Sequence, residues 1–272
     1  MESETETLSR LLRAASNDPD VAQNIRRHAT GILTHLGMSW SDAASFIDLA
    51  LRMTATSDWL LAVESNLFDR LPLTIDQMLE KRMTERSVRT FAQFASLLEH
   101  GSVLDLGGGS GEIGMMMRAH GNDVTIADIR DWRSFIARNL LFLPVSNNTI
   151  PLDSGSIDTV IILMALHHSS NRKRMLAEAF RVAHRDVIVI ESVTNSLDEY
   201  LYGCWIDWFY NRVLHYVEDA DLRIPVPCNF LPATGWEQLV CKLTNLRPCV
   251  SKDLGISQDL NPERHWLLRW KK

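Results

Sequence analysis

The chain has little cysteine, and its cysteines are not spaced as metal ligands. No two of them form a Cys-x-x-Cys pair, and none has a histidine at zinc-site spacing; they are Cys204, Cys228, Cys241 and Cys249. A structural zinc site is therefore not expected, and the thiols are interpreted as core or free side chains. Because no compact ligand motif for another metal occurs either, we expect no metal in the site; the alternative is a metal bound by His167 and His168 together with Glu191 or Asp207.

Long apolar runs and an excess of positive charge are also lacking. No stretch approaches the ~18 apolar residues of a membrane span, and the acidic start Met1–Glu6 lacks the basic residues and apolar run of a signal peptide. The formal net charge of −6 is spread over mixed acidic and basic residues, which argues against nucleic-acid binding. We expect a cytoplasmic protein that binds neither membranes nor nucleic acids.

The chain does have the composition of an ordinary globular protein. It is 46% apolar and 23% charged over 272 residues, enough for one large domain with a helical extension. Between residues 8 and 100, apolar residues recur at three- and four-residue spacing, with breaks at Pro19, Gly37 and Pro72. This predicts a helical N-terminal extension over residues 1–100, serving as a lid, a cap or a dimer contact.

From Ser102 onward, apolar strands alternate with helical stretches. Strands are predicted at 103–106, 124–127, 141–145, 157–164 and 187–190, and helices after the first strand, at 132–140 and at 172–182. This alternation predicts an α/β fold with a Rossmann-like, doubly wound and mostly parallel sheet. Two closing runs, 249–252 and 265–270, are expected to pair as an antiparallel hairpin. The domain would span 101–272, with an aromatic-rich helical insertion at about 196–235.

A glycine-rich turn follows the first predicted strand. Gly107, Gly109 and Gly111 would let the backbone approach a ligand closely at the N-terminus of a helix. The overlapping pattern from Gly109 to Gly114 also satisfies the dinucleotide fingerprint of NAD enzymes. The turn by itself therefore leaves the cofactor open.

Two acidic residues favour S-adenosylmethionine (SAM) over NAD. Asp128 ends the second predicted strand, where a carboxylate can accept hydrogen bonds from the ribose hydroxyls that both cofactors carry. Asp105 lies two residues before Gly107, where a dinucleotide needs uncharged room for its pyrophosphate. An acid at that position instead favours the ammonium of the amino-acid tail of SAM.

The segment Val103–Glu112 resembles motif I of the class I SAM-dependent methyltransferases. The resemblance extends over 102–194: Ile150–Val160 resembles the segment before the fourth strand of that family, and Leu166-His167-His168 resembles the LHH of its small-molecule group. It implies SAM as cofactor and S-adenosylhomocysteine as product. The implied cofactor-binding residues are Asp105, Gly107, Gly109, Gly111, Asp128, Ile129, Asn147, Asn148 and Met164.

The chain departs from the family pattern at two places. The stretch Ser146-Asn147-Asn148 stands where members often have an acid that contacts adenine, so an amide or a hydroxyl is expected to make that contact. The glycine pair before the last parallel strand is replaced by Ala183–Asp186, which predicts a tighter or differently shaped turn. Neither departure removes the SAM site.

Candidate catalytic residues follow the predicted strands at 157–164 and 187–190. Methyl transfer requires positioning of the acceptor and, for an oxygen or carbon acid, a base. We take His168 as the first candidate base, with His167 and Glu191 beside it. Packing or helix capping is the alternative role for the two histidines.

The insertion supplies candidate acceptor contacts. Asp207, Asn211 and His215 recur every four residues and would form one polar stripe on a helix, which faces either the acceptor or solvent. Tyr202 is a further candidate contact. None of these side chains identifies the acceptor.

We predict a SAM-dependent methyltransferase that acts on a small-molecule acceptor, with secondary metabolism as a hypothesis. One alternative is a SAM-binding protein without methyl transfer, acting as a cyclase, a regulator or an interaction module. A second is an NAD-linked oxidoreductase, which only the overlapping glycine pattern supports. The N-terminal helices would mediate a homodimer or cap the sheet domain.

Overall fold

The computed structural model describes residues 3–57, 59–146, 149–219, 222–257 and 263–272. It divides into a helical unit and a sheet unit. The helical unit comprises Met1–Arg82, Thr194–Phe230 and Ser257–Glu263, and the sheet unit comprises Met83–Val193, Leu231–Ile256 and Arg264–Lys272. This division differs from the expected boundary near residue 100, because part of α5 (Ile75–Phe94) groups with the sheet and the insertion groups with the N-terminal helices.

The helical unit consists of helices with clear start signals. They are α1 (Glu4–Asn17), α2 (Pro19–His35), α3 (Trp40–Thr56), α4 (Leu60–Phe68) and α8 (Leu197–Trp208). Ser3 and Glu6 form a capping box on α1, and Asp18 caps α2 directly before Pro19. Since α8 packs against α1 and α2, the insertion supplies part of the core of this unit. The helical predictions for the N-terminal region and the insertion are confirmed.

A π-helix, η4 (Phe209–Leu214), continues directly from α8. Trp205 stacks on Phe209 with ring centroids 5.2 Å apart, and both side chains are fully buried. The fully buried Glu64 of α4 accepts hydrogen bonds from Trp208 Nε1 at 2.9 Å, Arg212 Nε at 3.3 Å and Arg223 Nη1 at 3.2 Å. A buried carboxylate thus anchors this segment to α4.

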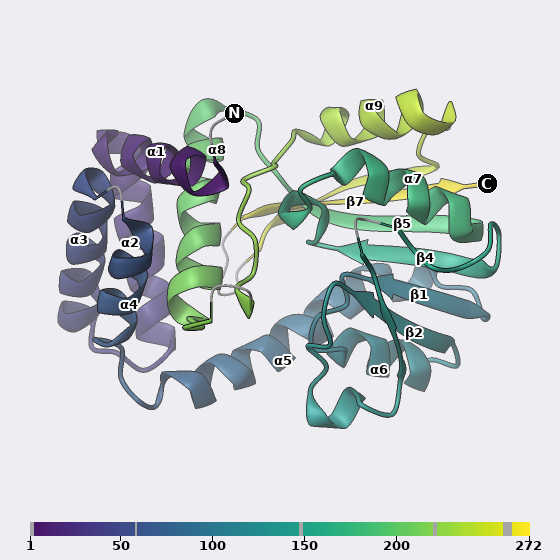
Figure 1. The fold of residues 1–272 in the computed structure, drawn as a ribbon, viewed down its shortest axis with the longest axis horizontal. Helices are drawn as coiled ribbons and strands as arrows, with labels where there is room; N and C mark the ends of the chain where they lie inside the picture. Colours follow the sequence, from purple (N-terminus) through teal and green to yellow (C-terminus); the bar gives the residue numbers. More distant parts are fainter. Residues whose placement is uncertain (1–2, 58, 147–148, 220–221, 258–262) are drawn as a thin grey trace. The chain divides into compact units, whose positions relative to one another are not determined.

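The sheet unit contains a mixed sheet with the predicted layout. Its strands are β1 (Ser102–Leu106), β2 (Asp123–Asp128), β3 (Leu141–Pro144), β4 (Ile157–Leu163), β5 (Ala183–Val193), β6 (Val250–Ile256) and β7 (Arg264–Lys271). They lie in the order β3-β2-β1-β4-β5-β7-β6, and Figure 1 labels β2, β1, β4, β5 and β7 of this sheet. The strands β1 to β5 pair in parallel, and β7 runs antiparallel to both β5 and β6. The predicted fold class is confirmed.

Each face of the sheet has its own core. The helices concerned are α6 (Glu112–Ala119), α7 (Arg172–Val182) and α9 (Ala233–Thr244). One core joins Leu176 of α7 and Trp236 of α9 to one face of β4 and β5. The other joins Phe94 of α5 and Met117 of α6 to the opposite face. Burial on both faces explains the near-continuous apolar run of β5, and it leaves the carboxyl ends of the parallel strands as the edge that can bind a ligand.

Two local predictions are wrong. The helix expected at 132–140 is only a 3-10 turn, η2 (Phe135–Ala137). In this loop the Arg133 guanidinium bonds to Asp131 and to the carbonyl of Leu140, so side-chain bonds replace helical ones. The turn expected at Ala183–Asp186 is also absent among these described residues, because β5 begins directly after the end of α7 at Val182.

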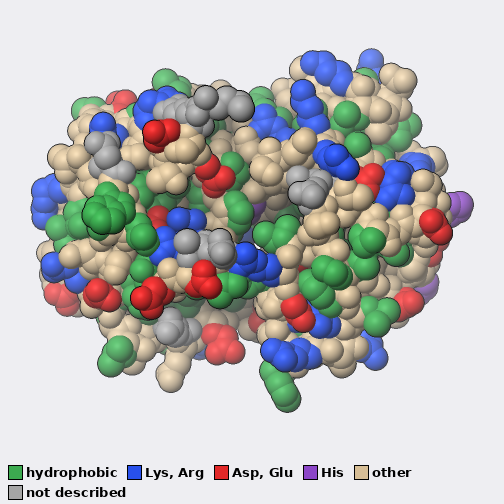
Figure 2. Space-filling view, in the orientation of Figure 1, with side chains coloured by type: hydrophobic (Ala, Val, Ile, Leu, Met, Phe, Trp, Pro, Cys, Tyr) green, Lys and Arg blue, Asp and Glu red, His purple; other side chains and the backbone are tan. Residues whose placement is uncertain are grey.

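Charged side chains of both signs are interspersed over the face of the molecule that Figure 2 shows. This distribution agrees with the mixed charge of the sequence. Within the described ranges, no helix combines the length and the apolar character that crossing a membrane requires.

Candidate active site

The glycine turn after β1 is shaped by two glycines with different surroundings. Gly107 has φ of +81°, and a Cβ there would lie 2.5 Å from the Cβ of Ala165, so a side chain does not fit. Gly109 has φ of +52°, and no atom lies within 4 Å of the position that its Cβ would take. The turn is therefore packed tightly on the side of β4 and is open at Gly109.

Asp128 closes the second side of this turn. Its carboxylate accepts hydrogen bonds from the backbone N–H groups of Gly109 at 3.1 Å and Ile129 at 2.7 Å. Burial raises the pKa of Asp128, and these backbone donors act in the opposite direction. The acid is thus held at the carboxyl end of β2 by the backbone of Gly109 and Ile129.

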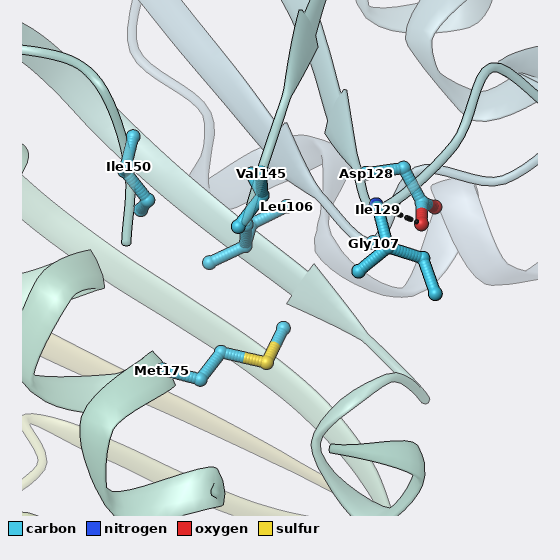
Figure 3. Close-up of a pocket in the computed structure, with 7 residues that line it drawn as sticks. All are labelled: Leu106, Gly107, Asp128, Ile129, Val145, Ile150 and Met175. Atoms are coloured by element: carbon cyan, nitrogen blue, oxygen red, sulfur yellow. Dashed lines mark hydrogen bonds between the residues drawn. The ribbon is translucent and has the colours of Figure 1, made fainter. Parts of the chain in front are cut away.

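A pocket lies beside Asp128, with about 330 Å³ of empty space that includes open solvent. It is lined by Leu106, Gly107, Asp128, Ile129, Val145, Ile150 and Met175. Figure 3 shows Asp128 and Ile129 on one side of the pocket, with Ile150 and Met175 on the other. Six of these seven residues offer no polar side chain, so an apolar slot with one acid suits a flat base joined to a ribose.

The pocket contains three of the predicted cofactor residues, Gly107, Asp128 and Ile129. Asn147 and Asn148 lie outside the described residues. Sequence reasoning missed the apolar lining residues; their signal was limited to Val145 and Ile150, which flank the segment already expected to contact adenine. In the sequence, apolar residues that line a pocket cannot be distinguished from core residues until the positions of the strand ends are known.

Asp105 lies within β1, directly beneath the glycine turn. Its side chain is buried, and a Cβ on Gly108 would lie 2.9 Å from its carboxylate. Burial raises the pKa of Asp105 to about 7, and the negative charge of Asp128 adds to the effect. The carboxyl group therefore gains or loses its proton near neutral pH.

This pKa predicts that Asp105→Asn stabilises the sheet unit at alkaline pH. The folded pKa of about 7 exceeds the ordinary value of 3.8, so the stabilisation from the proton is fully present below pH ~4 and is lost as pH rises through ~7. The loss amounts to at most about 4 kcal/mol. We expect urea unfolding at pH 8 to show the variant as more stable than the wild type, with SAM binding weakened. Equal stability differences at pH 5 and pH 8 would contradict this prediction.

Met164 follows β4 and adopts a left-handed conformation, with φ of +52°. A methionine in this conformation is unusual and marks a constrained backbone. Its Sδ atom lies 3.0 Å from Nη2 of Arg86, which is carried by α5. The predicted cofactor residue Met164 thus lies one strand away from the glycine turn, at the same edge of the sheet.

Glu191 and His167 form a buried pair at the ends of β5 and β4. Glu191 is fully buried, and its two oxygens accept hydrogen bonds from the backbone N–H of Leu166 at 2.6 Å and from Nδ1 of His167 at 2.7 Å. Because Nδ1 donates to the carboxylate, Nε2 is the atom of neutral His167 that can accept a proton. This is the arrangement of a histidine base with an orienting acid.

His168 has a different environment from His167. It is partly buried, and its ring centroid lies 4.1 Å from that of His167, with the rings tilted by 43°. The carboxylate of Glu191 bonds to His167. The geometry therefore makes His167, rather than our first candidate His168, the histidine that Glu191 orients.

The predicted acceptor contacts lie in the helical unit. Asp207 and Asn211 are buried, and Nδ2 of Asn211 donates to Oδ1 of Asp207 at 2.7 Å. The solvent-facing alternative is therefore wrong for these two residues. His215 leaves the expected stripe, because the π-helix changes the spacing and its Nδ1 bonds to the carbonyl of Tyr210 at 3.0 Å. Tyr202 Oη lies 2.9 Å from Nδ1 of His28.

Comparison with known proteins identifies the central part of the sheet unit. Residues 104–190 match the family model described as a methyltransferase domain. No curated protein sequence matches the chain. The match begins within β1 and ends within β5, so it includes the glycine turn, Asp128 and both histidines.

Solved structures share the fold at low sequence identity. A SAM-dependent methyltransferase from Thermotoga maritima superposes with a TM-score of 0.51 and 14% identity, covering 73% of this chain and 96% of that one. A SAM-dependent methyltransferase from Aquifex aeolicus gives a TM-score of 0.45 and 15% identity, with 69% and 88% covered. The first of these likenesses supports the assignment of the fold.

Proposed function

We propose that this chain, whose residues 104–190 match a methyltransferase domain, transfers the methyl group of SAM to a small-molecule acceptor and that His167 removes the proton of that acceptor. The observation that carries the proposal is the buried bond between Glu191 and His167 at the ends of neighbouring strands. A role in secondary metabolism is part of this proposal.

The residues around the glycine turn fit the cofactor. The backbone at Gly107 and Gly109 permits close approach, Asp128 offers carboxylate oxygens for ribose hydroxyls, and the apolar slot accommodates the base. Asp105 favours a positive charge near the turn. SAM supplies an electrophilic methyl group on a sulfonium, so the protein has to orient the acceptor and manage its proton.

In this proposal His167 is the residue that takes up that proton. Nε2 of His167 accepts it from the acceptor as the oxygen or carbon atom attacks, and the resulting imidazolium is stabilised through Nδ1–H by the carboxylate of Glu191. Both side chains are excluded from water, which strengthens their electrostatic interaction. We retain Tyr202, Asp207 and Asn211 as proposed contacts for the acceptor.

Asp128→Ala is expected to weaken SAM binding by about 10- to 100-fold, because hydrogen bonds to a charged acceptor are each worth ~1.5–3 kcal/mol. Calorimetric titration with SAM and S-adenosylhomocysteine measures the loss. Asp123→Ala is the matched control, since Asp123 is exposed at the other end of β2, and its affinity should equal that of the wild type. Unchanged SAM affinity in Asp128→Ala would remove Asp128 from the cofactor site.

Turnover is tested with SAM carrying a deuterated methyl group and a panel of small alcohols, phenols, amines and hydroxy acids. We expect a product heavier by one labelled methyl group from at least one acceptor class, together with S-adenosylhomocysteine. Tight SAM binding without labelled product from any class would favour a SAM-binding protein that does not transfer methyl groups. Binding of NAD in place of SAM would contradict the proposal.

A homodimer through the helical unit is a further part of the proposal. Trp40 and Trp59, at the starts of α3 and α4, are 61% and 71% exposed, respectively. Large exposed aromatic side chains are enriched at interfaces between proteins. Sedimentation of the wild type and of a Trp40→Ser, Trp59→Ser variant tests it: a monomeric wild type would contradict the dimer.

A further inference from the structure

A second polar cluster lies at the same edge of the sheet, on the face that α5 covers. His265 is the second residue of β7 and pairs in register with Ser192 of β5. Side chains alternate along a strand, so His265 shares a face with Leu267, which belongs to the core formed with Phe94 of α5. His265 is thus on the face of the sheet that α5 covers. In the sequence it is far from motif I.

His265 is a buried side chain with an unused polar atom. It is only 5% exposed, and its Nε2 atom has no hydrogen-bond partner among the residues that the structure describes. A buried polar atom without a hydrogen-bond partner is energetically unfavourable, because it has lost its bonds to water without replacing them. This Nε2 atom lies at a strand end, at the edge of the sheet where ligands can bind. A ligand that bonds to it would account for the missing hydrogen-bond partner.

Arg86 of α5 supplies a positive charge to this cluster. It precedes the buried residues Thr90 and Phe94 by one and two helical turns, so it lies on the stripe that faces the sheet. Its Nη2 atom reaches Met164 Sδ at 3.0 Å. Burial and the charges of Arg86 and His167 lower the pKa of His265 to about 3, so His265 is neutral while Arg86 carries the charge.

These groups match one ligand chemistry. A guanidinium offers several N–H donors in a planar fork that fits a carboxylate, and a neutral imidazole adds one N–H donor when the proton is on Nε2. We propose that Arg86 and His265 bind a carboxylate of the methyl acceptor. This inference rests on the proposed function and narrows its acceptor to a hydroxy or amino compound that carries a carboxylate.

The order of the strands assigns this carboxylate to the acceptor and not to the tail of SAM. Asp128 lies on β2 and the glycine turn follows β1, whereas His265 lies on β7. Three strand spacings separate β1 from β7 across β4 and β5, which is about 14 Å. A cofactor whose ribose is at β2 and whose tail is at β1 leaves the ends of β5 and β7 to the acceptor.

The test uses the smallest carboxylates, so that the shape of an unknown acceptor does not matter. Formate and acetate are titrated into the full-length protein saturated with S-adenosylhomocysteine, and the ring nitrogen signals of His265 are followed by NMR, with His265→Gln for assignment. We expect saturable shifts for both anions and none with equal concentrations of chloride. In Arg86→Gln, binding should weaken at least about tenfold.

Arg89→Gln is the matched control, because Arg89 is exposed on the same helix; it should bind formate like the wild type. Absence of a saturable shift, or equal formate binding in Arg86→Gln, would overturn the site. Formate shifts that appear in protein free of S-adenosylhomocysteine and vanish once the protein is saturated with it would assign the carboxylate to the cofactor and overturn the acceptor assignment. Loss of SAM affinity in Arg86→Gln would do the same. The readout needs no turnover, so failure of methyl transfer is a separate result.

Discussion

Glu191→Gln is expected to lower the turnover of methyl transfer by about 10²- to 10⁴-fold while leaving SAM affinity within about twofold of the wild type. The carboxylate oxygen Oε2 accepts the bond from Nδ1 of His167. An amide at this position can donate a hydrogen bond to Nδ1 of His167. The ring proton of His167 would then be on Nε2, the atom that has to accept the proton of the methyl acceptor. The amide also removes the negative charge that stabilises the imidazolium.

Two histidine variants separate catalysis from packing in the same region. His167→Gln should lose turnover as strongly as Glu191→Gln, and the double variant should lose little more, because the two residues act as one unit. His168→Gln serves as the matched control, since the neighbouring ring is partly buried and Glu191 is bonded to His167. A larger loss in His168→Gln than in His167→Gln would return the base to our first candidate.

The pH dependence offers an independent readout of this pair. If His167 acts as the base, turnover at saturating SAM should rise as the imidazole loses its proton and should level off above its pKa. If Glu191 only positions His167, Glu191→Gln should lower the turnover without moving the midpoint of this pH profile. Loss of the pH-dependent rise in His167→Gln, together with the loss of rate, therefore identifies the proton acceptor.

The sheet could be predicted from the sequence because its signals are local. The apolar runs that become β1, β4 and β5 are buried on both faces, and the glycine turn is fixed by residues adjacent in the chain. Asp128 could be placed at the end of β2 for the same reason, and its contact with a ribose stays a prediction. Local patterns therefore sufficed to predict β1, β2 and the glycine turn between β1 and α6.

The other end of the sheet depends on pairings that the sequence does not reveal. His265 lies 74 positions after Glu191 and reaches the same edge only because β7 pairs antiparallel with β5. Nothing in the local sequence separates this histidine from an ordinary strand residue. The choice between His167 and His168 likewise depended on which ring the Glu191 carboxylate meets in three dimensions.

The insertion shows a third limit of prediction from the sequence: the helix changes from α-helical to π-helical spacing within it. The i, i+4 spacing of Asp207 and Asn211 survives as a buried hydrogen bond, but a π-helix begins at Phe209 and displaces His215 from the stripe. A uniform α-helical period cannot anticipate that change. The charged residues that fix the segment, Glu64 and Arg223, are also far apart in the chain.

Glu64→Ala is expected to lower the free energy of unfolding of the helical unit by about 3–5 kcal/mol, because removal of one partner leaves buried charges uncompensated. The side chain of Glu64 is fully buried, and that of Arg223 is only 6% exposed. Arg212 and the indole N–H of Trp208 lose the same acceptor. Urea unfolding followed by tryptophan fluorescence measures the loss.

Asp48→Ala is the matched control within the same unit, since Asp48 pairs with Arg26 across side chains that are 40% and 49% exposed, respectively. Such a surface pair contributes about 1 kcal/mol or less. Glu64→Gln should lie between the two variants, because the amide oxygen can still accept one hydrogen bond but cannot balance two guanidinium groups. An equal cost for Glu64→Ala and Asp48→Ala would mean that water or a rearranged side chain replaces the carboxylate, and Glu64 would then not anchor the π-helix to α4.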